Sequence, residues 1–169
     1  MELSLERYRL AALQSTKNNP SVAGSNMPNL SGGQFPDNDK RLQPRLLLNM
    51  FPGSCILKND KLHFQGTLNG WYGVPKQNWR LVFRASTHGF SAAAFHRYCD
   101  GVAPAFVIAL GASCEISGGF TDVPWAKTSR KGGYIHSERS FLFSLCSATE
   151  PPTKYDIVKK PYAICYHPE

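Results

Sequence analysis

The clearest pattern in the sequence is an alternation of apolar and polar residues from position 79 to position 86. Side chains on a strand point to its two faces in turn, so this alternation predicts a strand with one buried face. The buried face would carry Trp79, Leu81, Phe83 and Ala85. The arginines between them, Arg80 and Arg84, would then lie together on the opposite face.

Five other segments have the length and composition of strands. Ala105–Leu110 is apolar at every position, which favours a central strand covered on both faces. Gly118 and Gly119 lie inside the next segment, where glycines often mark a bulge or a close approach of two backbones. The strands that we expect besides Ala105–Leu110 are Cys114–Phe120, Phe141–Cys146, Tyr155–Val158 and Tyr162–Cys165.

A helix is expected to begin at Ser91, which is a good N-cap, and to run to about Cys99. Phe90 and Phe95 are spaced as a hydrophobic staple around its start. Gly101 suits the left-handed backbone that ends many helices.

Two more helices are predicted nearer the N-terminus. One would be capped by Asn59 or Asp60, with its apolar side at Phe64, Leu68 and Trp71. The other would cover Glu2–Gln14, where a broad apolar stripe is present.

Turn-forming residues dominate residues 15–44, which favours a flexible linker. We therefore expect an N-terminal helix over residues 1–14, the linker over residues 15–44, and a folded domain over residues 45–169. Short strands with few helices indicate an α+β fold, an antiparallel β-sandwich or sheet with flanking helices.

The net charge of +7 narrows the class of partner only slightly. The cations form small, separate groups, which favours an ordinary basic surface and no specific nucleic-acid binding. Five cysteines at wide spacing, none in a C-x-x-C pair, favour reduced thiols. The N-terminus has no signal-peptide core, and no stretch approaches the roughly 20 apolar residues of a membrane span. We expect an intracellular, cytoplasmic protein.

Several residues are candidates for catalysis. His96 and Cys99 lie three positions apart on the expected helix, as a base and a nucleophile would, although a core cysteine is the simpler interpretation. Glu115 and Asp122 flank the two glycines and could form an acid–base pair, although solvated carboxylates would look the same.

A metal or a cofactor is not expected. The candidate zinc ligands are His96, Cys99, Cys165 and His167, but their spacing does not match a zinc site. Gly118 and Gly119 also do not fit a dinucleotide or phosphate loop. The best candidate for a binding patch is Arg80 and Arg84 with His88, because arginine is enriched at protein interfaces.

Several segments, in this order, resemble the TLDc domain family. The lead-in segments are Ile56–Leu57 and Leu68–Trp71, followed by the strand that begins at Trp79. The later segments are, in order, His88–Ser91, Phe95–His96, Cys99–Gly101, Phe106–Ile108, Gly118–Asp122, Trp125 and Phe141–Leu145.

This resemblance implies a β-sandwich flanked by helices and a non-enzymatic protein-interaction module. It also implies a role in protection against oxidative stress and, in several members, binding to the vacuolar proton-pumping ATPase. Two alternatives remain open, an enzyme that uses Cys99 or Glu115 and an inactive truncated product.

The sequence departs from the family pattern in two places. Ser117 stands where an aromatic or bulky residue is usual, and the family's glycine-rich stretch and closing strands do not follow Ile164. We therefore expect an unclosed sheet with exposed edges, through which two chains could form a dimer.

Overall fold

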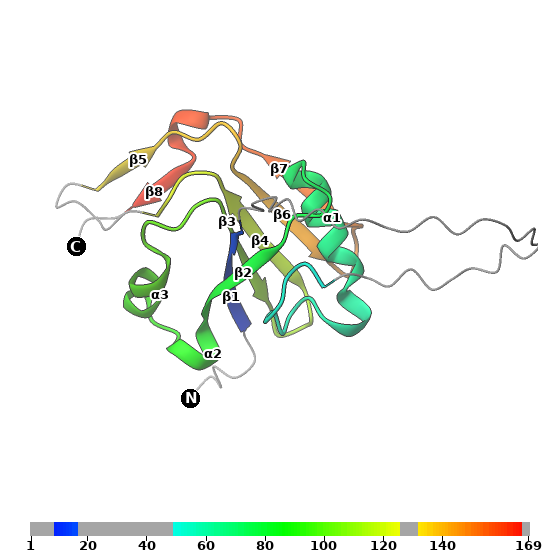
Figure 1. The fold of residues 1–169 in the computed structure, drawn as a ribbon. Helices are drawn as coiled ribbons and strands as arrows, with labels where there is room; N and C mark the ends of the chain where they lie inside the picture. The colour runs from blue at the N-terminus through cyan, green and yellow to red at the C-terminus, as the bar shows by residue number, and fades with distance from the viewer. Residues whose placement is uncertain (1–8, 17–48, 126–131, 167–169) are drawn as a thin grey trace, which may run out of the picture.

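The computed structural model describes residues 9–16, 49–125 and 132–166. Its centre is a six-stranded sheet in the order β2-β1-β3-β4-β6-β7, and all neighbouring strands are antiparallel (Figure 1). The bounds are β1 Arg9–Ser15, β2 Trp79–Arg84, β3 Ala105–Leu110, β4 Ile116–Thr121, β6 Phe141–Cys146 and β7 Thr153–Asp156. A second, two-stranded sheet pairs β5, Gly133–Ile135, with β8, Ile164–Tyr166.

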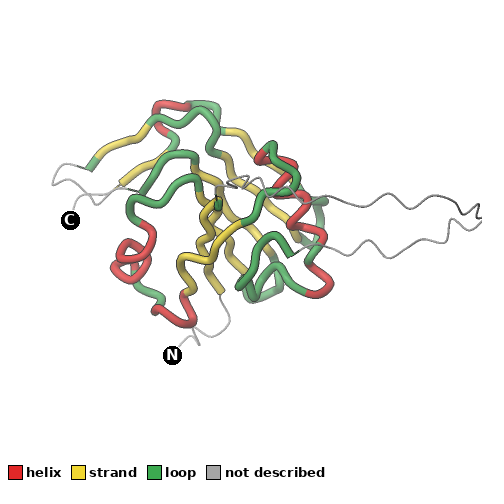
Figure 2. The backbone as a smooth tube through the Cα atoms, in the orientation of Figure 1, coloured by secondary structure: helices red, strands yellow, loops and turns green. Residues whose placement is uncertain are grey.

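Short helices accompany the sheet (Figure 2). They are α1 His63–Tyr72, α2 Ala85–His88 and α3 Ala92–Cys99, with 3-10 turns at Asn59–Lys61 and Lys160–Tyr162. The large sheet is not closed, since β2 and β7 are its outer strands. The expected α+β class with an antiparallel sheet is therefore confirmed. None of the helices among the described residues has the length and apolar character needed to cross a bilayer.

Local signals set the ends of the helices. Ser91 caps α3 as expected, because its hydroxyl accepts a hydrogen bond from the Ala94 amide at 3.1 Å. The second expected helix is also present as α1, but it begins at His63 without a side-chain cap. Asn59 instead begins a 3-10 turn before that helix, so the predicted cap is wrong.

One face of the sheet packs against α1 and the segment before it. The indole of Trp79 lies at its centre, with ring centroids 4.6 Å from Phe106 and 5.6 Å from Phe51. Its Nε1 donates to the side-chain oxygen of Asn69 on α1 at 2.7 Å, so a buried polar pair holds α1 on the sheet. We call this the main core. Phe141 and Phe143 enter it from β6, as their alternation predicts.

The N-terminal helix prediction is wrong over the part that the structure describes. Residues 9–15 form β1, which lies between β2 and β3. Ala11 and Leu13 face the main core, whereas Ala12 packs on the opposite face. A strand buried on both faces is apolar at successive positions, so its pattern resembles the broad stripe of a helix. Nearly all of the expected linker lies outside the described residues, and so do residues 1–8.

A bulge in β2 corrects the predicted faces of that strand. Leu81 pairs with Leu13 and Phe83 pairs with Ala12, so Val82 has no residue opposite it. The extra residue reverses the alternation beyond it. Trp79 and Leu81 therefore face the main core. Phe83 and Ala85 instead join a second cluster with Ala12 and Cys99 on the other face.

Candidate functional site

The second face of the sheet carries a groove of about 890 Å³. Its floor is a row of directly opposed residues that crosses the sheet from strand to strand. The row is Phe83, Ala12, Val107, Gly119, Leu142 and Tyr155. Every residue of this row except Ala12 lines the groove.

Two walls bound this floor. Phe95 of α3 forms one, in edge-to-face contact with Trp125 at 5.7 Å between ring centroids. Phe90, which precedes α3, also lines the groove. The other wall is the segment after β7, through Ile157 and Ile164. The walls come from segments far apart in the sequence, so only the folded chain assembles the groove.

The groove exposes large apolar side chains. The side chain of Leu142 is 60% exposed, that of Tyr155 is 46% exposed and that of Phe90 is 45% exposed. Single exposed apolar residues are common on protein surfaces, but a contiguous apolar patch on a sheet face is typical of a binding surface. Here the exposed residues share one groove, which favours a binding role.

Gly119 deepens the floor. An added Cβ at Gly119 would stand 3.2 Å from the Leu142 Cδ2 atom, so a side chain there would push into the groove. The sequence pattern singled out the two glycines but gave no sign that Gly118 serves the core and Gly119 the groove.

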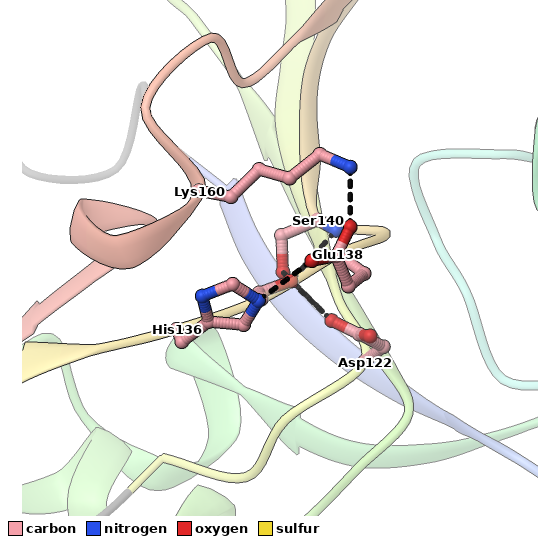
Figure 3. A network of polar contacts seen from close by, with 6 residues as sticks. Asp122, His136, Glu138, Ser140 and Lys160 are labelled. Atoms are coloured by element: carbon pink, nitrogen blue, oxygen red, sulfur yellow. Dashed lines mark hydrogen bonds and ion pairs between the residues drawn. The ribbon is translucent and has the colours of Figure 1, made fainter.

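A polar cluster adjoins the groove, whose lining includes Ser140. Figure 3 shows this cluster from close by. The buried hydroxyls of Ser137 and Ser140 both donate to the Asp122 carboxylate, Ser140 at 3.2 Å. The Ser140 amide also donates to the Ser137 hydroxyl at 2.9 Å. These bonds tie the end of β4 to the start of β6.

Beside the cluster of Asp122, Ser137 and Ser140, the exposed Glu138 accepts hydrogen bonds from His136, at 2.8 Å, and from Lys160. The hydrogen bond from Lys160, then the one from His136, holds the pKa of Glu138 below its ordinary value. The His136 Nε2 atom thus points to Glu138 and not to a serine hydroxyl (Figure 3). No serine here is paired with a histidine base, so the cluster is suited to holding loops together rather than to nucleophilic catalysis.

The catalytic candidates are not assembled into a site. Glu115 is exposed before β4, while Asp122 follows its other end, so the strand separates the two carboxyl groups. Cys99 is 1% exposed. Burial, and then the charge of Asp100, raises the pKa of the Cys99 thiol from 9.0 to about 12. His96 hydrogen-bonds Asp100 at 2.8 Å and lines the groove. A thiol that stays protonated at neutral pH is a poor nucleophile.

The three residues of the expected binding patch do not share a surface. Arg80 pairs with Gln14 and donates to its side-chain oxygen at 2.9 Å, on the groove side of the sheet. Arg84 lies beyond the bulge, and its guanidinium donates to the Gly53 carbonyl on the side of the main core.

His88 is half-buried and contacts Tyr98 and Arg84 of its own chain. Its ring stacks on Tyr98 with centroids 4.2 Å apart, and its Nδ1 accepts from the Arg84 amide at 3.1 Å. The groove could not be predicted as a candidate site, because the sequence pattern does not reveal which strands are neighbours in the sheet.

Across residues 9–16, 49–125 and 132–166, no three histidine, cysteine or acidic residues come close enough to hold a metal ion together. His167 of the considered zinc set lies outside these residues.

Comparison with known proteins identifies the family. The family model of the TLDc domain matches residues 52–169, which is more than half of the chain. No curated protein and no solved structure matches the chain. The match leaves out β1, although this strand lies in the middle of the sheet. The chain belongs to the TLDc domain family.

Proposed function

We propose that this chain is a non-enzymatic interaction module whose groove binds an extended segment of a protein partner. The observation that carries the proposal is the uncovered row of Leu142 and Tyr155 on an apolar sheet face. Apolar surface that is removed from water on binding stabilises a complex by roughly 25 cal/mol per Å² before the costs of association are subtracted. The best ligand is therefore a segment with apolar side chains at alternate positions, which can lie along the sheet face.

The partner that we propose is the vacuolar proton-pumping ATPase, and the process is protection against oxidative stress. Both come from the resemblance to TLDc domains. The groove supports this proposal by offering a surface for a protein segment, whereas the buried Cys99 thiol gives no support to an enzyme.

The test compares two exposed apolar residues. Leu142→Asp places a charge on the groove floor, whereas Val158→Asp places the same charge at a position that is 94% exposed and does not line the groove. Binding of each variant to the purified soluble sector of the ATPase would be measured by surface plasmon resonance. We expect Leu142→Asp to weaken binding by about tenfold or more, since an unpaired charge is costly to bury. Val158→Asp should bind as the unchanged chain does.

Two results would contradict the proposal. Absence of binding by the unchanged chain would exclude this partner. Equal binding by both variants would show that the groove is not the contact surface. Near-ultraviolet circular dichroism would confirm that both variants keep the packing around Trp79.

Cells that express each variant, challenged with peroxide, test the proposed process. We expect Leu142→Asp to lose protection while Val158→Asp retains it. Equal survival would separate the groove from stress protection.

A further inference from the structure

The outer strand β7 has an open edge. Among the residues that the structure describes, it is the last strand of the sheet and pairs with β6 alone. In an antiparallel ladder alternate residues turn their backbone N–H and C=O groups toward each side, so within the described part of the chain the β7 groups that point away from β6 have no strand partner. The chain leaves β7 toward the groove face, where Ile157 lines the groove.

The side chains of β7 carry a self-complementary charge pattern. Lys154 pairs with Phe143, and Asp156 pairs with Phe141, so both charges lie on the side of the main core. Within one chain they form an ion pair at 2.6 Å, and the Asp156 side chain is 76% exposed. Tyr155 stands between them on the groove face.

We propose that two copies of this chain pair through β7, antiparallel and centred on Tyr155. In this register Lys154 of each copy lies directly opposite Asp156 of the other, which gives two equivalent ion pairs across a two-fold axis. Opposite charges that face each other across strands stabilise the pairing. A lysine alone on an edge strand would disfavour pairing with another strand. Here the aspartate two residues later offers that lysine an opposite charge in the second copy.

The nearby registers are worse. A register centred on Lys154 sets two lysines against each other, and it places Pro152, which has no N–H, opposite Asp156. A register centred on Asp156 sets two acids against each other. A shift of one residue would join the groove face of one copy to the core face of the other. The sequence of β7 therefore specifies one register.

The pairing would also extend the groove. Leu142 and Tyr155 are direct neighbours on the groove face. Across the two-fold axis, Tyr155 of one copy would meet Tyr155 of the other, so both apolar rows would join into one. This inference concerns the edge of β7 and does not depend on what the groove binds.

The test is sedimentation velocity of the full chain with charge-reversed variants. We expect the unchanged chain to dimerise. Lys154→Asp leaves only acids at the two positions, and Asp156→Lys leaves only bases. Each variant alone should self-associate more weakly by on the order of tenfold or more, because both cross-strand pairs become repulsive.

Mixing the two single variants should restore a dimer, since every facing pair again joins an acid to a base. The double variant, Lys154→Asp with Asp156→Lys, should dimerise by itself. Restored association also shows that the single variants are folded. Lys76→Asp makes the same charge change on an exposed residue that is not part of β7 and should leave the dimer intact.

Two outcomes overturn the inference. The first is that the unchanged chain remains a monomer at roughly 100 μM, a concentration at which even a weak dimer would be visible. The second is a dimer whose strength does not change in the single variants or is not restored in the mixture. Either result would mean that β7 does not join two copies in this register.

Discussion

Gly118 should be among the least replaceable residues of this sheet. It faces the main core on β4, between Ile108 of β3 and Phe143 of β6. A Cβ atom added there would lie 2.1 Å from the Val107 carbonyl oxygen and 2.6 Å from the Phe143 Cζ atom. The first is backbone of the neighbouring strand and the second is a buried ring, so neither can move without disturbing the ladder or the core.

The expected cost of Gly118→Ala follows from these contacts. Inserting extra atoms into a packed core costs about 1–3 kcal/mol, and more where the surroundings cannot yield. Because one contact is backbone, we expect a loss of about 3 kcal/mol or more. That corresponds to a fall in Tm of roughly 6–12 °C, since 1 kcal/mol shifts a chain of this size by about 2–4 °C.

Gly119→Ala is the matched control. Its Cβ atom would point to the groove and stand 3.2 Å from Leu142 Cδ2, the end of a flexible and exposed side chain. That side chain can rotate away. Alanine also reduces the entropy of the unfolded chain, which stabilises by about 0.4–1 kcal/mol. We expect a net change of about 1 kcal/mol or less.

Urea unfolding followed by tryptophan fluorescence measures both variants, with the slope of each transition checked for constancy. Similar losses in the two variants, or a loss below about 1 kcal/mol for Gly118→Ala, would refute the close approach of β3, β4 and the Phe143 ring.

Three further predictions concern the core. The raised pKa of Cys99 contributes stability that is complete below pH 9.0 and is lost as the pH rises toward about 12; urea titrations should show this decline, and it should be smaller in Cys99→Ala. Asn69→Ala should cost about 1–3 kcal/mol in thermal unfolding, since it leaves the buried Trp79 N–H without its acceptor; a loss below about 0.5 kcal/mol would contradict that role. A chain that starts at Asn49 lacks β1, so β2 and β3 lose their shared neighbour. It should show no cooperative unfolding by circular dichroism, and a sharp transition would mean that β2 and β3 can pair directly.

Much of the fold could be predicted because its signals are local. Ser91 caps α3 through an amide three residues away, and that geometry depends on little else. The strand at Phe141 alternates because one of its faces is buried and the other is open. The strand Ala105–Leu110 is apolar throughout because both of its faces are packed: Phe106 and Ile108 lie in the main core, and Val107 packs against the second cluster.

The errors arose where tertiary contacts overrode local patterns. Residues 9–14 carry an apolar stripe that suits a helix. They form a strand because they pair with β2 on one side and with β3 on the other. The bulge at Val82 moves Phe83 to the other face, and no residue type signals it. The bulge also places Arg80 and Arg84 on opposite faces of the sheet, so they do not form the single patch that the alternation predicted.

By itself, the sequence determined the α+β class, the main strands, the capped helix and the resemblance to TLDc domains. The first three features depend on periodicity and on contacts within a few residues, which a linear pattern records. The resemblance depends on several short motifs that occur in the family's order. The tertiary structure alone decided the strand order, the place of β1 and the groove. A groove floor that runs from Phe83 to Tyr155 joins residues from six strands. Its existence depends on which strands pair and in which register, and those long-range choices leave no periodic trace in the chain.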